Sequence, residues 1–257
     1  FRLKVLTFIL AKKMKIPKFV GEVTTEVNSR VGDVLSQKGF PYPYYKMLKY
    51  SMKSFKRRWD AALLICLLGA LDYDQKRAYQ IATATSLLVP ALFVVDDLID
   101  ESRKREDRTT LWAKYGAEET ILSVHTLINL FWEEITRLEK RELVDVSLDS
   151  MNRLLLGEYR DITRNKPGML SEEEYWTLCY EKAGAITETL GKIAATAADA
   201  EPTKWDIVVG GGKLIGILSQ IIDDVLDLED DLLQGKTSLP IILLGKWIKQ
   251  GNRDRLW

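Results

Sequence analysis

Apolar residues recur along most of the chain at the three- and four-residue spacing of an α-helix, with breaks where glycine and proline gather. Segment 20–37 carries an apolar stripe of Val20, Val23, Val27, Val31 and Val34. Another segment opens with Ser171 and Glu174, which is the pattern of a capping box at the start of a helix. The long helices are predicted near 75–103, 117–138, 142–164 and 204–232.

No segment shows the alternation of a β-strand, a tight hairpin turn or a short internal repeat. The pattern therefore predicts about ten helices, packed as one all-α domain over residues 1–257. Residues 1–16 mix apolar and basic side chains, so this segment would lie on a membrane surface or pack its apolar face on the domain. No apolar run reaches the roughly 18 residues of a membrane-spanning helix.

The charge balance excludes one class of partner. Lysine plus arginine and aspartate plus glutamate each number 37, so no positive field favours nucleic acid. The two cysteines, Cys66 and Cys179, lie in apolar or aromatic helical segments without a CxxC pair. They are typical of reduced core residues, which favours a cytoplasmic protein.

Two groups of three aspartates change this picture. Each group has the spacing Asp-Asp-x-x-Asp: Asp96, Asp97 and Asp100 in FVVDDLID, and Asp223, Asp224 and Asp227 in SQIIDDVLD. In each group the first and third aspartates share a helix face, where like charges repel and destabilise the helix. Both groups follow an apolar segment. The arrangement indicates a bound cation at the end of two apolar helices.

Carboxylate oxygens suit Mg²⁺, which keeps several waters and is commonly completed by the phosphates of a substrate. Two such clusters facing each other above an apolar cavity would bind a molecule with a diphosphate head and a hydrocarbon tail. A single cluster is explained as well by a solvated acidic helix end. Two copies, both after apolar helices, favour the metal site.

The residues around the two clusters resemble those of the trans-isoprenyl diphosphate synthases, the polyprenyl synthetase family. DDLIDESRKREDRTTLW is similar to the first aspartate-rich motif of the family, and QIIDDVLDLEDDLLQGKTSLP is similar to the second. The resemblance runs from about residue 50 to 244. It implies an isoprenoid synthase fold, which is a single helical bundle around a central apolar cavity, and a homodimer.

In such enzymes both motifs bind three Mg²⁺ ions that hold an allylic prenyl diphosphate. After the diphosphate leaves, isopentenyl diphosphate attacks the allylic cation and a longer prenyl diphosphate forms. The resemblance assigns metal binding to Asp96, Asp97, Asp100, Asp223, Asp224 and Asp227. It assigns substrate binding to Lys56, Arg57, Arg105, Lys182, Gln220 and Lys236. Lys182 and the aspartates other than Asp227 are also expected to act in catalysis.

The chain departs from the family pattern in the segment that binds isopentenyl diphosphate. That segment is here SFKRRWD, with Trp59 and Asp60 in place of an arginine and a proline, and Arg58 is a candidate to compensate. After the first motif, Glu106 and Asp107 replace an arginine and a glycine. The pattern indicates an atypical member of the family. The residues that bind the metal and the allylic diphosphate are intact, whereas the site for isopentenyl diphosphate is eroded.

Two positions bear on product length. In the family, bulky aromatic residues four and five positions before the first aspartate close the pocket for the hydrocarbon tail. Here those positions are Leu92 and Ala91, neither of which is aromatic. The resemblance therefore implies a product of C20 or longer.

Three functions fit these residues. The first is a Mg²⁺-dependent trans-prenyltransferase of isoprenoid biosynthesis that uses isopentenyl diphosphate. The second keeps the ionisation step and passes the cation to another acceptor, or to the substrate's own double bonds as in a class I terpene synthase. The third is a subunit that regulates a catalytic homologue, against which two complete aspartate clusters argue. A cytoplasmic location is expected, with membrane contact through residues 1–16.

Overall fold

The computed structural model describes residues 16–52, 57–105, 107–163, 170–235 and 237–249. Within these ranges the chain is helical apart from one short pair of strands, so the predicted all-α class is confirmed. Two compact units make up the chain. Unit 1 is Phe1–Asp145 with Ile193–Trp205, and unit 2 is Val146–Lys192 with Asp206–Trp257. The single domain over residues 1–257 stays a prediction.

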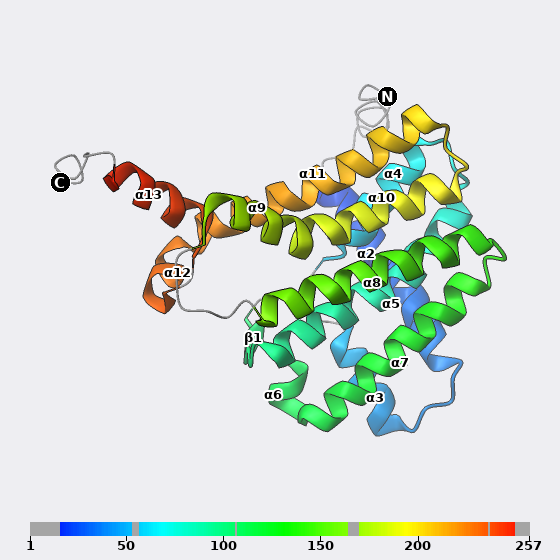
Figure 1. Ribbon diagram of the computed structural model, residues 1–257. Coiled ribbons are helices and arrows are strands. Elements are labelled where there is room, and N and C mark those ends of the chain that lie inside the picture. Colours follow the sequence, from blue (N-terminus) through cyan, green and yellow to red (C-terminus); the bar gives the residue numbers. More distant parts are fainter. Residues whose placement is uncertain (1–15, 53–56, 106, 164–169, 236, 250–257) are drawn as a thin grey trace. The chain divides into compact units, whose positions relative to one another are not determined.

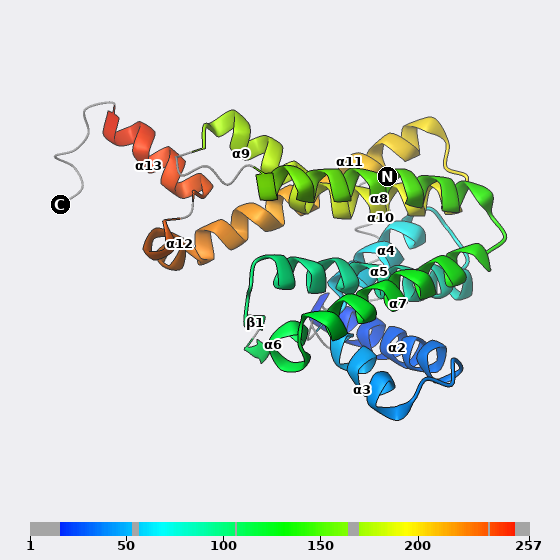
Figure 2. The ribbon, with the colours of Figure 1, turned by 60° about the horizontal axis from the view of Figure 1, so that its bottom comes forward.

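Unit 1 is built around one long helix, α5. Its helices are α2 (Ile16–Ser36), α3 (Tyr42–Ser51), α4 (Trp59–Ala70), α5 (Gln75–Ile99), α6 (Leu111–Tyr115) and α7 (Ala117–Thr136). Helix α5 packs on α7, α4 and α2 (Figures 1 and 2). It begins at an N-cap, where the side chain of Asp74 accepts a hydrogen bond from the backbone N–H of Arg77 at 2.9 Å. Most of its apolar side chains are buried in this core.

The valine stripe of α2 faces the same core. Val20, Val23, Val27 and Val31 are buried, as predicted. The last buried position is Leu35, however, whereas Val34 is only half-buried. A helix has 3.6 residues per turn, so a stripe that continues after Val31 can take the third or the fourth residue, and the larger leucine fills the core here.

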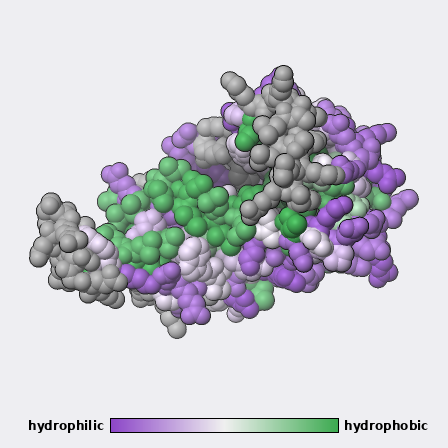
Figure 3. All heavy atoms as spheres, turned by 90° about the horizontal axis from the view of Figure 1, so that it is seen from above, coloured by the Kyte–Doolittle hydropathy of each residue, from purple (hydrophilic) through white to green (hydrophobic). Residues whose placement is uncertain are grey.

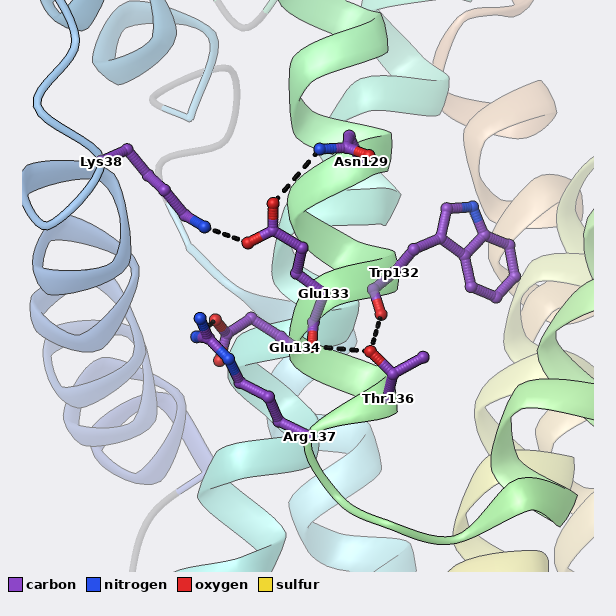
Figure 4. Close-up of polar contacts among 7 residues, drawn as sticks. All are labelled: Lys38, Asn129, Trp132, Glu133, Glu134, Thr136 and Arg137. Atoms are coloured by element: carbon purple, nitrogen blue, oxygen red, sulfur yellow. Dashed lines mark hydrogen bonds and ion pairs between the residues drawn. The ribbon is translucent and has the colours of Figure 1, made fainter.

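Side chains tie the end of α2 to α7 (Figure 4). Lys38 pairs with the carboxylate of Glu133, which also accepts a hydrogen bond from Asn129 Nδ2 at 3.3 Å. One turn on, the hydroxyl of Thr136 donates to the carbonyl of Trp132 at 2.7 Å, which satisfies an acceptor near the helix end. The Lys38–Glu133 pair is partly exposed, so it contributes about 1 kcal/mol or less to stability.

A proline inside α5 explains a buried arginine. Pro90 has no N–H, so the carbonyl of Ser86 one turn earlier lacks its helical donor. Arg58 supplies donors here: its Nη1 approaches the Ser86 carbonyl at 3.5 Å, and its Nη2 donates to the Met52 carbonyl at 2.8 Å. Its Nε donates to Oδ1 of Asn28 at 3.0 Å. The side chain of Arg58 thereby lies wholly within unit 1, with 0% of the residue exposed.

A short antiparallel pair of strands follows the first aspartate cluster, where the sequence shows no strand signal. β1 (Lys104–Arg105) pairs with β2 (Arg108–Thr109). Asp107 lies between them with a φ of 64°, a left-handed conformation that aspartate tolerates better than most residues. Two residues per strand are too few for alternation to appear in the sequence, which is why the pattern missed the pair.

Unit 2 contains the remaining helices, with the ends of three of them counted in unit 1. They are α8 (Arg141–Thr163), α9 (Glu172–Cys179), the π-helix η1 (Tyr180–Gly184), α10 (Ala185–Ala197), α11 (Pro202–Leu226), α12 (Leu228–Gln234) and α13 (Leu239–Lys249). The predicted capping box opens α9, with Ser171 and Glu174 each bonded to the other's backbone N–H. The helix predicted over 204–232 is wrong in extent, because the chain leaves helical geometry at Asp227 and divides into α11 and α12.

Helices α10 and α11 approach each other backbone to backbone at glycines of α11. A Cβ at Gly212 would overlap the carbonyl oxygen of Thr187 in α10. One at Gly216 would overlap the carbonyl oxygen of Ala183 in η1 and the hydroxyl oxygen of Thr187. Gly211 differs, because a Cβ there would meet no atom within 4 Å. Two of the glycines of α11 are therefore required by close packing.

We expect Gly216→Ala to lower the free energy of unfolding by about 1–3 kcal/mol, because the added methyl group overlaps the backbone of η1 and forces it away from α11. Gly211→Ala is the matched control on the same helix. It should raise the same free energy by about 0.5–1 kcal/mol, since alanine loses less conformational entropy in a helix than glycine. Urea unfolding followed by circular dichroism measures both. A gain in stability from Gly216→Ala would contradict the close packing.

Helix α11 also presents an exposed apolar face. Its large exposed apolar residues include Leu214, Ile215, Leu218, Ile222 and Val225. Figure 3 shows apolar side chains gathered in a band, seen from above. By length and apolarity alone, α5 and α11 would each suffice to cross a membrane. The apolar stretch of α5 is 72% buried, as in a core helix, and that of α11 is 17% buried.

Candidate active site

The first aspartate cluster lies at the C-terminal end of α5. Asp96 and Asp97 belong to its last turn, and Asp100 is its C-cap residue. The partial negative charge of a helix C-terminus disfavours carboxylates, so this position adds to the repulsion among the three. The apolar, buried body of α5 positions the cluster, because it fixes the helix in the core of unit 1.

Arg105 of β1 is the counter-ion of this cluster. Its Nη2 lies 3.0 Å from Oδ2 of Asp96, and its Nε donates to Oδ1 of Asp97 at 2.9 Å. Its guanidinium also lies over the ring of Phe93, with 5.0 Å between the guanidinium carbon and the ring centroid. The short strand pair therefore places a cation against the carboxylates.

One cation does not fully compensate the cluster. The side chain of Asp97 is 4% exposed. Burial raises the pKa of Asp97, the bond to Arg105 opposes this, and the charges of Asp96 and Asp100 raise the pKa further. A further positive charge near Asp97 would be favourable.

The second cluster lies at the C-terminal end of α11, where Asp223 and Asp224 belong to the last turn and Asp227 follows the helix. Asp223 and Asp227 are exposed, whereas Asp224 is buried. Partial burial raises the pKa of Asp223, and the neighbouring charges of Asp227 and Asp224 raise it further. Among the described residues, the carboxyl of Asp223 is therefore the one of this cluster whose charged form is disfavoured.

Lys182 lies in the π-helix η1, between α9 and α10. Single-turn π-helices occur frequently at functional sites, because the extra residue shifts the side chains that follow. Helix α8 passes close to η1, and a Cβ at Gly157 would lie 3.3 Å from the carbonyl oxygen of Glu181. Arg160 of α8 pairs with Glu181 at 2.6 Å. The half-buried Lys182 is thus presented by a segment that α8 holds in place.

An open groove of about 1080 Å³ lies in unit 2, between α9, α11 and α13. Its lining includes the apolar residues Trp176, Ile217 and Ile242, together with Lys213 and Lys246. Lys246 pairs with Glu172 across the groove. This groove lies wholly within unit 2. It is not the central apolar cavity predicted for the whole chain, which stays a prediction.

The carboxylates fit a hard divalent cation by their chemistry. Within the described ranges, no group of three or more histidine, cysteine, aspartate or glutamate side chains is arranged to hold a metal ion by itself. Mg²⁺ does not need one, since it is usually bound through one or two carboxylates together with water and substrate phosphates. The raised pKa values of Asp97 and Asp223 mark where a cation would relieve repulsion.

The sequence of residues 42–253 matches the family model of the polyprenyl synthetases. The chain belongs to the polyprenyl synthetase family. The octaprenyl diphosphate synthase of Haemophilus influenzae is 27% identical over 192 residues, which are 70% of this chain and 58% of that protein. The geranylgeranyl diphosphate synthase of Methanosarcina mazei is 24% identical over 218 residues, 79% of this chain and 67% of that protein.

The fold is that of solved polyprenyl synthetases. The structure is similar to the geranylgeranyl pyrophosphate synthetase of the archaeon Geoglobus acetivorans, with a TM-score of 0.80 and 22% identity over 90% of this chain and 77% of that one. The predicted isoprenoid synthase fold is therefore confirmed. The chain spans 58% of the Haemophilus influenzae relative and 63% of the Escherichia coli octaprenyl diphosphate synthase.

The structure corrects one assignment in the basic segment of this polyprenyl synthetase. Arg58 does not compensate for the missing arginine, because its guanidinium is buried and bonded within unit 1. Arg57 is exposed, and its role in substrate binding stays a prediction. The predicted substrate residues Lys56 and Lys236, and residues 1–15, lie outside the described residues. Ala91 is fully buried in the core of unit 1 and Leu92 is half-buried, and their role in product length stays a prediction.

The sequence did not point to Tyr175. Its hydroxyl donates to Oδ2 of Asp224 at 2.7 Å, and burial followed by this hydrogen bond raises the pKa of Tyr175. Gln220 donates to Oδ1 of the same aspartate at 2.9 Å, one turn earlier on α11. The sequence pointed to Gln220 because this residue lies just before the second aspartate cluster. Tyr175 lies 49 residues away, so only the fold brings it to the cluster.

Proposed function

We propose that this polyprenyl synthetase is a Mg²⁺-dependent trans-prenyltransferase. It ionises an allylic prenyl diphosphate and joins it to isopentenyl diphosphate, giving a prenyl diphosphate of C20 or longer. The observation that carries the proposal is the pair of Asp-Asp-x-x-Asp clusters at the ends of apolar helices, each with a carboxylate of raised pKa. Bound Mg²⁺, which we take to be three ions, would neutralise the leaving diphosphate.

Three kinds of side chain would take part in this reaction: carboxylates, basic residues and apolar residues. The six aspartates would hold the cations, some of them through water: Asp96, Asp97, Asp100, Asp223, Asp224 and Asp227. Lys182 and Arg105 would contact diphosphate oxygens, because lysine and arginine bind phosphate through charge-assisted hydrogen bonds. Apolar side chains around the reacting carbons would keep water from the allylic cation.

A second function shares the ionisation step but uses another acceptor, or the substrate's own double bonds. One observation favours it: the basic segment for isopentenyl diphosphate has lost Arg58 to the core of unit 1. Asp60, two residues later, is half-buried with its Oδ2 shielded from solvent, and burial raises the pKa of its carboxyl group while Arg58 opposes this. Neither group is available to a diphosphate.

We also propose a homodimer, with α8 at the interface. Helix α8 presents large exposed apolar residues at Leu148, Leu155, Tyr159 and Ile162. These positions are spaced by seven, four and three residues, so they form a single stripe along the helix. An apolar stripe of this kind is what a partner helix covers. Peripheral membrane contact through residues 1–15 and a cytoplasmic location remain proposals.

The experiment that tests the function is an incubation of the full chain with Mg²⁺ and geranyl, farnesyl or geranylgeranyl diphosphate. Each is tested with and without isopentenyl diphosphate, and products are identified by mass spectrometry before and after phosphatase treatment. We expect longer diphosphates only in the presence of isopentenyl diphosphate, and their length reports the pocket. Release of diphosphate with alcohol or hydrocarbon products, and without elongation, would establish the second function instead.

A further inference from the structure

Asp224 differs from the other aspartates of its cluster in that protein groups occupy its carboxylate. Its Oδ2 accepts hydrogen bonds from the hydroxyl of Tyr175 at 2.7 Å and from the backbone N–H of Leu239 at 3.0 Å. Its Oδ1 accepts one from Gln220 at 2.9 Å. The residue is 6% exposed. A carboxylate has about four lone-pair positions, so three are already used.

The donors come from three segments of unit 2. Tyr175 belongs to α9, Gln220 to α11 itself, and Leu239 is the first residue of α13. Tyr175 is buried in a small apolar cluster with Cys179 and Ile242, against which Leu239 packs. Asp224 therefore lies where α9, α11 and α13 meet, and its charge is stabilised by the N-terminal N–H of α13.

The contact with Leu239 closes a loop in the chain. The residues between Asp224 and Leu239 include Asp227, helix α12 and Lys236. Two of these, Asp227 and Lys236, are assigned to the diphosphate site. One lone-pair position of Asp224 remains, on Oδ1, but the residue is only 6% exposed, so a hydrated cation would reach it only by displacing a donor. A displaced Tyr175 hydroxyl would lack a partner, which is unfavourable.

We infer that Asp224 is a positioning residue and binds no cation directly. Together with Tyr175 it fixes the segment 227–235 on α11, so that Asp223 and Asp227 are the carboxylates of this cluster that bind the metal. The inference rests on the proposed function, since it assigns roles within the same site. It also makes Tyr175 part of the machinery of that site.

The first test uses amide hydrogen exchange of the metal-free protein, which reports the loop contact without any activity. Tyr175→Phe should speed exchange of amides in 228–239 by about tenfold, the effect of losing one hydrogen bond. Asp224→Ala removes the acceptor of three and should speed it by more than about tenfold. Asp223→Ala and Tyr180→Phe are the controls and should leave this exchange unchanged. Tyr180→Phe removes an equivalent hydroxyl, whose partner is Glu188 at 3.0 Å. Unchanged exchange in Asp224→Ala would overturn the inference.

The second test measures bound Mn²⁺ per chain by electron paramagnetic resonance, with inorganic pyrophosphate as the probe. We expect Asp223→Asn to lose bound Mn²⁺, whereas Asp224→Asn keeps the number of the unmodified protein, because asparagine retains an oxygen for Leu239 or Tyr175. Equal loss in both asparagine variants would show that Asp224 is a ligand and would overturn the inference. No loss in Asp223→Asn would overturn the metal role of this cluster in the proposed function, and the assignment with it, whatever the exchange result.

Discussion

Asp96→Ala and Asp223→Ala should each lower kcat by at least about 100-fold, because each removes a carboxylate that holds a cation at the leaving diphosphate. Both variants should remain folded. The folded-state pKa of Asp223 is raised, so its charged form opposes folding at neutral pH, and stability increases as the pH falls through that pKa. Asp223→Ala should therefore be at least as stable as the unmodified protein at pH 7 without metal, and should lack this gain at low pH.

Diphosphate release measures the rate, and circular dichroism with thermal unfolding at several pH values measures the fold. Glu229→Ala is a suitable control, because Glu229 is an exposed carboxylate of α12 two residues after the motif. Its kcat should stay within about twofold of the unmodified value, as expected for a surface substitution. Near-normal rates in Asp96→Ala or Asp223→Ala, with the fold retained, would mean that the clusters do not serve the ionisation step.

Arg58→Ala should lower the free energy of unfolding by about 3–5 kcal/mol, the effect of removing one partner from a buried charged network. The substitution leaves the carbonyls of Met52 and Ser86 without a donor. It also leaves the buried carboxyl of Asp60 without the cation that opposes its rise in pKa. Arg57→Ala, one residue earlier and exposed, should change stability by about 0.5 kcal/mol or less and instead raise KM for isopentenyl diphosphate.

Denaturant unfolding of the two single variants separates these roles. A third variant, Arg58→Met with Asp60→Asn, removes both charges and should recover part of the lost stability, because no isolated charge remains in the core. A stable Arg58→Ala variant with a raised KM would instead place Arg58 at the substrate. In that case Arg58 would replace the missing arginine of the isopentenyl diphosphate segment, a role that its burial argues against.

The sequence predicted the features that depend on neighbours along the chain. The aspartate clusters, the capping box at Ser171 and the long helices all follow from spacing within a few turns. The pairing of Arg105 with Asp96 also spans only nine residues. It depends, however, on a turn at Asp107, and the sequence around that turn shows no alternation of apolar and polar residues that would predict strands. Sequence similarity had assigned Arg105 to the substrate, without indicating that it also neutralises the cluster.

Features that depend on distant segments were beyond the sequence. The bond from Tyr175 to Asp224 joins residues 49 positions apart, and tyrosine has no spacing rule that would reveal it. The basic run at 56–58 shows the same limit. Adjacent lysines and arginines look alike in a sequence, yet Arg57 is exposed and Arg58 is buried, because the start of α4 directs successive side chains to different sides.

The proline in α5 and the arginine before α4 have a joint consequence for how this protein can change over generations. Pro90 removes one backbone hydrogen bond from α5, and Arg58 supplies a donor to the carbonyl that Pro90 leaves open. Exchange of Pro90 for alanine would restore the helical donor and crowd the guanidinium, and exchange of Arg58 alone would leave the carbonyl unsatisfied. The two positions are thus coupled in free energy, and a change at one alters which residues the other tolerates.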